Sequence, residues 1–124
     1  ARLIPVELDG ELHARLAKAF PRLRTLSGDA ARLSELLAGH GVGPVACVVS
    51  SLPLLAMPAA VVEAIVTAIV AVLPANGALV QFTYGPASPV PPELMRRLHL
   101  HGARGRRIWS NLPPAVVWRF TRRA

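Results

Sequence analysis

The sequence predicts an α/β fold, in which short strands alternate with helices along a single chain of 124 residues. Three observations predict this class. Apolar runs of strand length recur along the chain, longer amphipathic or apolar runs separate them, and hydrophobic residues make up 52% of the sequence against 17% for charged ones. A chain of this size and composition can bury one modest core, and the same composition argues against a disordered protein.

The first fifty residues contain three apolar segments that we interpret as strands, at residues 3–7, 23–26 and 45–49. Polar residues follow all three. The first strand ends at the carboxylate of Glu7, the second leads into Ser-Gly-Asp-Ala at 27–30, and the third leads into Ser-Ser-Leu-Pro-Leu at 50–54. Carboxylates at the ends of successive buried strands are typical of open α/β sheets, which bind nucleoside-like ligands along their carboxyl edge.

Three helices are predicted between and after these strands. Residues 11–20 have apolar side chains at helical spacing, and residues 30–38 form a second helix with Asp29 as its N-cap and Gly39 at its end. Residues 58–73 are apolar nearly all round. This third segment is too short and too interrupted to span a bilayer, so it predicts a helix buried against the sheet.

The last third of the chain predicts a strand, a short helix and a terminal antiparallel hairpin. The strand covers residues 78–84, a proline-rich loop follows, and the helix covers residues 93–99. Residues 104–109 and 116–122 alternate at period two and are joined by Asn-Leu-Pro-Pro at 111–114. With no internal repeat and no linker, the chain is interpreted as part of one domain.

Positive charge is concentrated in the second half of the chain. Residues 1–62 contain six Lys and Arg against five acidic residues, whereas residues 63–124 contain eight Arg against two Glu. Arginine suits bidentate contacts to phosphate, so the excess favours a phosphate-bearing partner, either lipid headgroups or nucleic acid. A solvated arginine-rich surface is the alternative.

The cysteine and histidine content does not predict a metal centre. Cys47 is the only cysteine and lies in an apolar strand, where we expect a small buried side chain. A disulfide or thiolate metal site within the chain is therefore excluded. The four histidines, His13, His40, His99 and His101, are scattered along the sequence. A serine hydrolase is not supported either, because no Gly-x-Ser-x-Gly elbow occurs.

The order of these motifs resembles the class I S-adenosylmethionine-dependent methyltransferases, which have a Rossmann-like sheet. The resemblance rests on the acidic strand end at Glu7, on Gly28-Asp29-Ala30 and on the Ser-Leu-Pro-Leu turn. Four further stretches resemble bacterial phospholipid N-methyltransferases: Ser-Leu-Pro-Leu-Leu at 51–55, Val-Gln-Phe-Thr-Tyr-Gly-Pro at 80–86, Ser-Pro-Val-Pro at 88–91 and Ile-Trp-Ser-Asn-Leu-Pro-Pro-Ala at 108–115.

This resemblance implies S-adenosylmethionine-dependent methylation of the phosphatidylethanolamine headgroup toward phosphatidylcholine. The enzyme would be cytoplasmic and peripheral on the inner face of the bacterial membrane, with the phospholipid surface as its partner. The cofactor, and its product S-adenosylhomocysteine, would be bound by Glu7, Leu8, Gly28, Asp29, Ala30, Ser50 and Ser51. Glu7 would accept from the ribose hydroxyls and Asp29 from the adenine amino group, the latter in competition with its N-cap role.

The implied substrate site consists of Leu52, Pro53, Leu54, Tyr84, Arg106, Arg107, Trp109 and Asn111. Tyr84 is the catalytic candidate because the acceptor amine must be neutral, and no His, Asp or Glu occurs at 50–55 or 81–86. Only one of Arg106 and Arg107 is expected to reach the headgroup phosphate, because alternate residues of a strand face opposite ways.

The sequence departs from the family pattern at one point. The family has a strand with a glycine-rich turn before the strand that ends at Glu7, and residues 1–124 lack this strand and turn. The resemblance implies that residues 1–124 are the C-terminal portion of a single methyltransferase domain. We expect the same or a separate chain to supply the missing N-terminal portion, and the isolated fragment to be inactive. Unpaired strand edges would otherwise be left on both sides of a gap in the sheet.

Two other functions stay open. An RNA or DNA adenine N-methyltransferase would explain the basic charge, but such enzymes carry an Asn and an aromatic at the catalytic turn, where Ser51 and Leu54 stand here. A nucleic-acid partner is therefore not favoured. The third possibility is a non-catalytic fragment or subunit.

Overall fold

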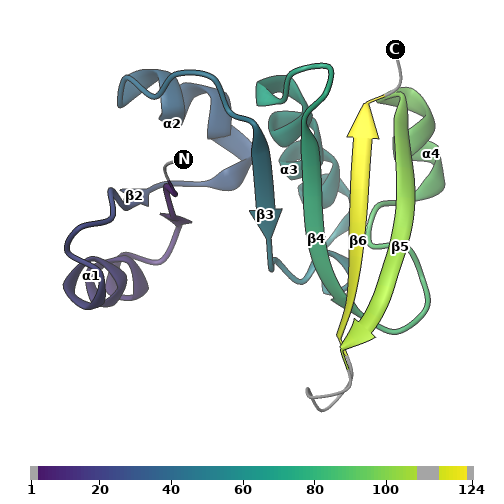
Figure 1. Cartoon of the computed structure of the whole chain (residues 1–124), viewed down its shortest axis with the longest axis horizontal. Helices are drawn as coiled ribbons and strands as arrows, with labels where there is room; N and C mark the ends of the chain where they lie inside the picture. Colours follow the sequence, from purple (N-terminus) through teal and green to yellow (C-terminus); the bar gives the residue numbers. More distant parts are fainter. Residues whose placement is uncertain (1–2, 109–114, 123–124) are drawn as a thin grey trace.

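The computed structural model describes residues 3–108 and 115–122, and it describes the backbone alone for residues 106–108. Strands and helices alternate as the sequence predicts (Figure 1). The strands are β1 (Val6–Glu7), β2 (Leu26–Ser27), β3 (Cys47–Ser50), β4 (Ala78–Tyr84), β5 (Leu100–Ile108) and β6 (Ala115–Arg122). The helices are α1 (Gly10–Ala19), α2 (Leu33–Gly39), α3 (Ala59–Val72) and α4 (Pro92–Arg97), with short 3-10 turns η1 (Ala30–Arg32) and η2 (Leu54–Ala56).

The described strands form two sheets that are not hydrogen-bonded to each other. β1 pairs in parallel with β2, whereas the second sheet has the order β3-β4-β6-β5. In that sheet β3 and β4 are parallel, and β6 is antiparallel to both β4 and β5. β1 lies on the side of β2 that faces β3 (Figure 1). The predicted α/β fold with an incomplete sheet and a C-terminal antiparallel hairpin is confirmed.

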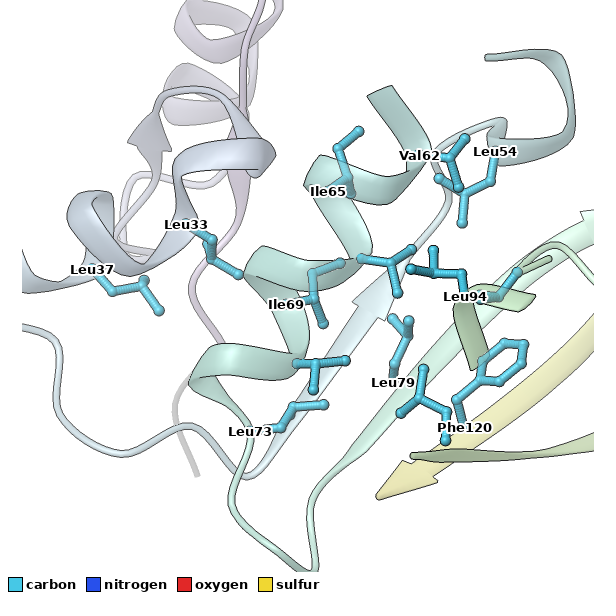
Figure 2. Packing of buried hydrophobic residues seen from close by; sticks show 14 of the residues in the cluster. Leu33, Leu37, Leu54, Val62, Ile65, Ile69, Leu73, Leu79, Leu94 and Phe120 are labelled. Atoms are coloured by element: carbon cyan, nitrogen blue, oxygen red, sulfur yellow. The ribbon is translucent and has the colours of Figure 1, made fainter. Parts of the chain in front are cut away.

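One hydrophobic core holds the two sheets together. The buried side of α3, at Val62, Ile65, Val66, Ile69 and Val70, packs with Leu79 of β4 and Phe120 of β6 (Figure 2). Leu26 of β2 and Leu33 and Leu37 of α2 belong to the same cluster. The predicted burial of α3 is therefore confirmed. In the described part of the chain, no helix has the length and apolar character to cross a membrane.

The four-stranded sheet has one covered face. Val48, Leu79 and Phe120 point toward α3, and cross-strand pairing places the alternate residues on the opposite face. On that face Cys47 is exposed, and Val49, Phe82 and Tyr84 keep 62%, 37% and 57% of their surface exposed. The expectation that Cys47 is buried is therefore wrong, because the described residues cover β3 on one side only.

The hairpin departs from simple alternation in β5. The pairing register shifts between Arg104 and Arg107, which is a β-bulge. Within it, a Cβ on Gly105 would lie 2.7 Å from the carbonyl oxygen of Val117, so the bulge requires glycine. The side chains of Arg106 and Arg107 lie outside the description, so the expectation that only one of them reaches the headgroup stays a prediction.

Candidate functional site

The predicted cofactor residues lie at one edge of the fold. β1 and β3 run in the same direction (Figure 1), and β2 and β4 are parallel to them, so the carboxyl ends of all four strands meet at this edge. Glu7 is the last residue of β1, Gly28 follows β2, and Ser50 ends β3. The structure thus places the three segments at one edge of the fold, with the ends of β1 and β2 tied together and the end of β3 in the neighbouring sheet.

Backbone pairing and local hydrogen bonds fix the two carboxylates. The Gly28 N–H donates to the Glu7 carbonyl at 3.0 Å, which ties the end of β2 to the end of β1. Glu7 Oε1 accepts from the Asp9 N–H at 3.2 Å, and Asp29 Oδ1 accepts from the Ala31 N–H at 2.9 Å. The N-cap role of Asp29 is therefore confirmed. Each of these bonds uses one carboxylate oxygen, so Glu7 Oε2 and Asp29 Oδ2 take no part in them.

Three neighbouring predicted residues differ in their surroundings. A Cβ on Gly28 would lie 2.8 Å from Leu36 Cδ2, so glycine lets the Leu36 side chain of α2 pack closely against this turn. Ala30 is half-buried where η1 begins. Leu8 is 66% exposed at the surface next to Glu7.

The segment after β3 forms an inverse γ-turn centred on Pro53, whose φ and ψ are −79° and 68°. The Leu54 N–H donates to the Leu52 carbonyl at 2.8 Å across this turn. The Leu52 N–H donates to Ser50 Oγ at 3.2 Å, and Gln81 Nε2 donates to the Leu52 carbonyl at 2.8 Å. Both peptide groups of Leu52 are therefore held in place from within the protein.

The predicted substrate residues of this turn differ in how exposed their side chains are. Leu54 is buried in the core near Val62 (Figure 2), so it does not lie on the surface of the turn. Leu52 is half-buried, whereas Ser51 and Pro53 are exposed. The surface that a ligand can reach therefore consists mainly of Ser51 and Pro53.

Tyr84 ends β4 at the same carboxyl edge, with its side chain on the uncovered face of the sheet. Of the other predicted substrate residues, Arg106 and Arg107 lie in β5 with their side chains outside the description, and Trp109 and Asn111 lie outside the described residues. No set of three His, Cys, Asp or Glu side chains is placed to hold a metal ion within residues 3–108 and 115–122.

Several arginines of the basic half already have partners. Arg97 pairs with Glu63 at 2.9 Å, which joins α4 to α3, lowers the pKa of the Glu63 carboxyl and raises the pKa of the Arg97 guanidinium. Arg96 pairs with Glu93, and Arg122 donates to the Leu73 carbonyl at 2.9 Å. Arg104 and Arg119 are exposed on the hairpin.

Sequence reasoning included Gln81 only as part of the stretch at 81–86 and gave it no role of its own. This residue is fully buried in β4 and hydrogen-bonds to a turn 29 positions earlier in the chain. The signal that could have indicated it is a single amide within the apolar run at residues 78–82.

Comparisons with known proteins identify the fold. No family model and no curated protein sequence matches the chain. A TehB-like SAM-dependent methyltransferase from Corynebacterium glutamicum matches in structure with a TM-score of 0.67 and 19% identity, over 98% of this chain and 68% of that chain. An rRNA methylase from Streptococcus thermophilus matches with a TM-score of 0.68 and 10% identity, over 99% of this chain and 74% of that chain.

The chain has the fold of the class I methyltransferases. A structure of LepI in complex with SAM shares this methyltransferase fold with a TM-score of 0.62 and 13% identity, over 98% of this chain and 43% of that chain. In all three matches the neighbouring protein has further residues that this chain does not match.

Proposed function

We propose that the chain is the C-terminal portion of an S-adenosylmethionine-dependent methyltransferase. The observation that supports this best is that Glu7, Asp29 and the Ser50–Leu54 segment all follow strands that end at one edge of a methyltransferase fold. The residues present fit the nucleoside part of the cofactor. Glu7 Oε2 is available to accept from the ribose hydroxyls and Asp29 Oδ2 from the adenine amino group. When bound, S-adenosylmethionine supplies an activated methyl group.

The proposed acceptor is the amine of phosphatidylethanolamine, methylated toward phosphatidylcholine. The stretches at 51–55, 80–86, 88–91 and 108–115 that resemble phospholipid N-methyltransferases support this choice. The turn also suits a small amine better than a nucleobase, because Leu54 is packed in the core and offers no ring on which a base can stack. Within this proposal the chain's own residues bind and orient the amine and exclude water from it.

The proposed partner surface is an anionic membrane on the cytoplasmic side, bound peripherally. Exposed arginines of the hairpin, Arg104 and Arg119, support it, together with Arg106, Arg107 and Arg123 in the same basic half of the sequence. Each arginine near an anionic surface contributes about 1 kcal/mol. We place Tyr84 and one of Arg106 and Arg107 at the headgroup.

Transfer of a labelled methyl group from S-adenosylmethionine by the full-length protein tests the acceptor. Phosphatidylethanolamine vesicles, ribosomal RNA and an adenine-containing oligonucleotide are compared, with phosphatidylcholine vesicles as the matched control that lacks a methylatable amine. We expect label in phosphatidylethanolamine. Label in RNA with none in lipid would instead favour the adenine methyltransferase that the similarity to an rRNA methylase suggests.

We further propose that an additional polypeptide segment completes the sheet between β1 and β3. Three features support this. The facing edges of β1 and β3 are unpaired among the described residues, the sheet face at Cys47, Val49 and Phe82 is apolar and uncovered, and the neighbouring folds contain further chain. A parallel strand followed by a helix with an apolar side would satisfy the edges and bury this face.

The exposed thiol of Cys47 allows this proposal to be tested. Maleimide labelling of Cys47, identified by mass spectrometry of its peptide, is compared between residues 1–124 and the full-length protein, with both unfolded proteins as controls. Burial removes access to the thiol, so we expect labelling at least about 10-fold slower in the full-length protein. Equal rates in the two folded proteins would contradict the proposal.

A further inference from the structure

Gln81 has an unusual environment for a glutamine. Its side chain is fully buried in β4, and its Nε2 donates to the carbonyl oxygens of Leu52 at 2.8 Å and Phe82 at 2.9 Å. Since both partners are carbonyl oxygens, the amide nitrogen must face them, which settles the orientation of the amide group. Gln81 Oε1 then points the other way, buried and without a partner among the described residues.

An apolar side chain of similar shape could fill this position in β4, but it could not donate to the Leu52 and Phe82 carbonyl oxygens. The facing residue on β6 in the pairing register, Trp118, also has a buried indole N–H without a partner among the described residues. What the amide does provide is the bond from the sheet to the Leu52 carbonyl.

That bond fixes the turn at the carboxyl edge. The Leu52 carbonyl accepts from both Gln81 and the Leu54 N–H, and the Leu52 N–H is bound to Ser50 Oγ. Ser51 and Pro53 are the exposed residues of this segment, and of the two only Ser51 has a side-chain hydroxyl. Neither that hydroxyl nor the Ser51 carbonyl takes part in these bonds. The Gln81 bond therefore determines where the free oxygen atoms of Ser51 lie.

We infer that Gln81 is a positioning residue, which holds the Ser50–Leu54 turn so that the oxygen atoms of Ser51 accept hydrogen bonds from the acceptor amine. This inference rests on the proposed methyl transfer to an amine. An N–H group directed at Ser51 orients the nitrogen lone pair away from the turn, toward the cofactor. Small displacements of such orienting groups lower turnover strongly, even when binding is retained.

Gln81→Met in the full-length protein tests the inference, since methionine keeps the length and removes the amide. We expect turnover on phosphatidylethanolamine vesicles to fall by about 10-fold or more, with S-adenosylhomocysteine affinity changed less than about twofold. Gln81→Asn keeps the amide but is one methylene shorter, so the amide no longer reaches the Leu52 carbonyl. We expect the same loss of turnover and the same retained affinity as for Gln81→Met. Thr83→Val is the matched control: it removes a buried hydroxyl from the same face of β4, and both values should stay within about twofold.

Hydrogen exchange of the Leu54 amide, measured by NMR with S-adenosylhomocysteine bound, gives a readout that needs no acceptor. Loss of the bond to Leu52 should speed this exchange by at least about tenfold in Gln81→Met and leave it unchanged in Thr83→Val. If the wild type binds cofactor but methylates no lipid, the proposed acceptor fails, and the exchange result alone decides whether Gln81 holds the turn.

Three results would overturn the inference. Unchanged Leu54 exchange in Gln81→Met would show that the amide does not hold the turn. Full turnover in Gln81→Met would show that its position does not matter for methyl transfer. Equal losses of turnover and thermal stability in Gln81→Met and Thr83→Val would show a merely structural role.

Discussion

Replacing Glu7 by alanine in the full-length protein is expected to weaken binding of S-adenosylhomocysteine by about 10- to 100-fold, since hydrogen bonds to a charged group contribute about 1.5–3 kcal/mol each. Glu7 ends β1, where the carboxylate keeps Oε2 free while Oε1 accepts from the Asp9 N–H. Part of the free energy that these hydrogen bonds contribute to binding is offset, because water hydrogen-bonds to Glu7 Oε2 when no ligand is bound. Calorimetric titration measures the change directly.

Glu11→Ala is the matched control for this prediction. Glu11 is an exposed carboxylate four residues along, in an ion pair with Arg15 on the surface of α1. Such exposed pairs contribute little, so affinity and stability should both stay near the wild-type values. An unchanged affinity in a folded Glu7→Ala variant would remove Glu7 from the cofactor site.

Tyr84→Phe is expected to lower turnover on phosphatidylethanolamine by about 10-fold or more, while cofactor affinity stays unchanged, because the variant loses one hydrogen bond to the acceptor. The ring of Tyr84 is 57% exposed at the end of β4, so removing the hydroxyl leaves no buried partner unsatisfied. Initial rates on vesicles, with S-adenosylhomocysteine affinity measured in parallel, check both halves of the prediction. Full activity in the phenylalanine variant would exclude Tyr84 from the mechanism.

Local patterns predicted most of the fold. The apolar segment at residues 58–73 contains α3, and the alternation of Val116, Trp118 and Phe120 places these residues on one face of β6. Asp29 caps the helical turn η1, which begins at the next residue. These features depend on neighbours close in sequence. The strands β1 and β2 are shorter than the apolar segments around them, because each pairs with the other over two residues and with no further described strand.

Long-range packing accounts for what the sequence did not predict. Val45 to Val49 is apolar on both faces, which is typical of a strand covered on both sides, so Cys47 was expected to be buried. Its exposure depends on what packs against β3 from elsewhere in the fold. The bulge at Gly105 depends likewise on the backbone of β6, although a glycine inside a strand is the usual signal for one.

The candidate site likewise contains residues that the sequence could predict and residues that it could not. Residues at strand ends, Glu7, Asp29 and Ser50, could be placed at one edge from the order of strands alone. The burial of Leu54 and the bond from Gln81 to Leu52 could not, because each depends on which distant side chains meet in the folded protein.

Titration of S-adenosylhomocysteine into the full-length protein and into residues 1–124 alone tests the central claim most directly. The proposed site needs both the carboxylates of this chain and the segment that completes the sheet. We therefore expect the full-length protein to bind with one site per molecule, and residues 1–124 to bind at least about 100-fold more weakly, since the nucleoside contacts alone remain. Absence of binding to the folded full-length protein would contradict the cofactor assignment, and equal affinity in the two proteins would contradict completion of the site by a further segment.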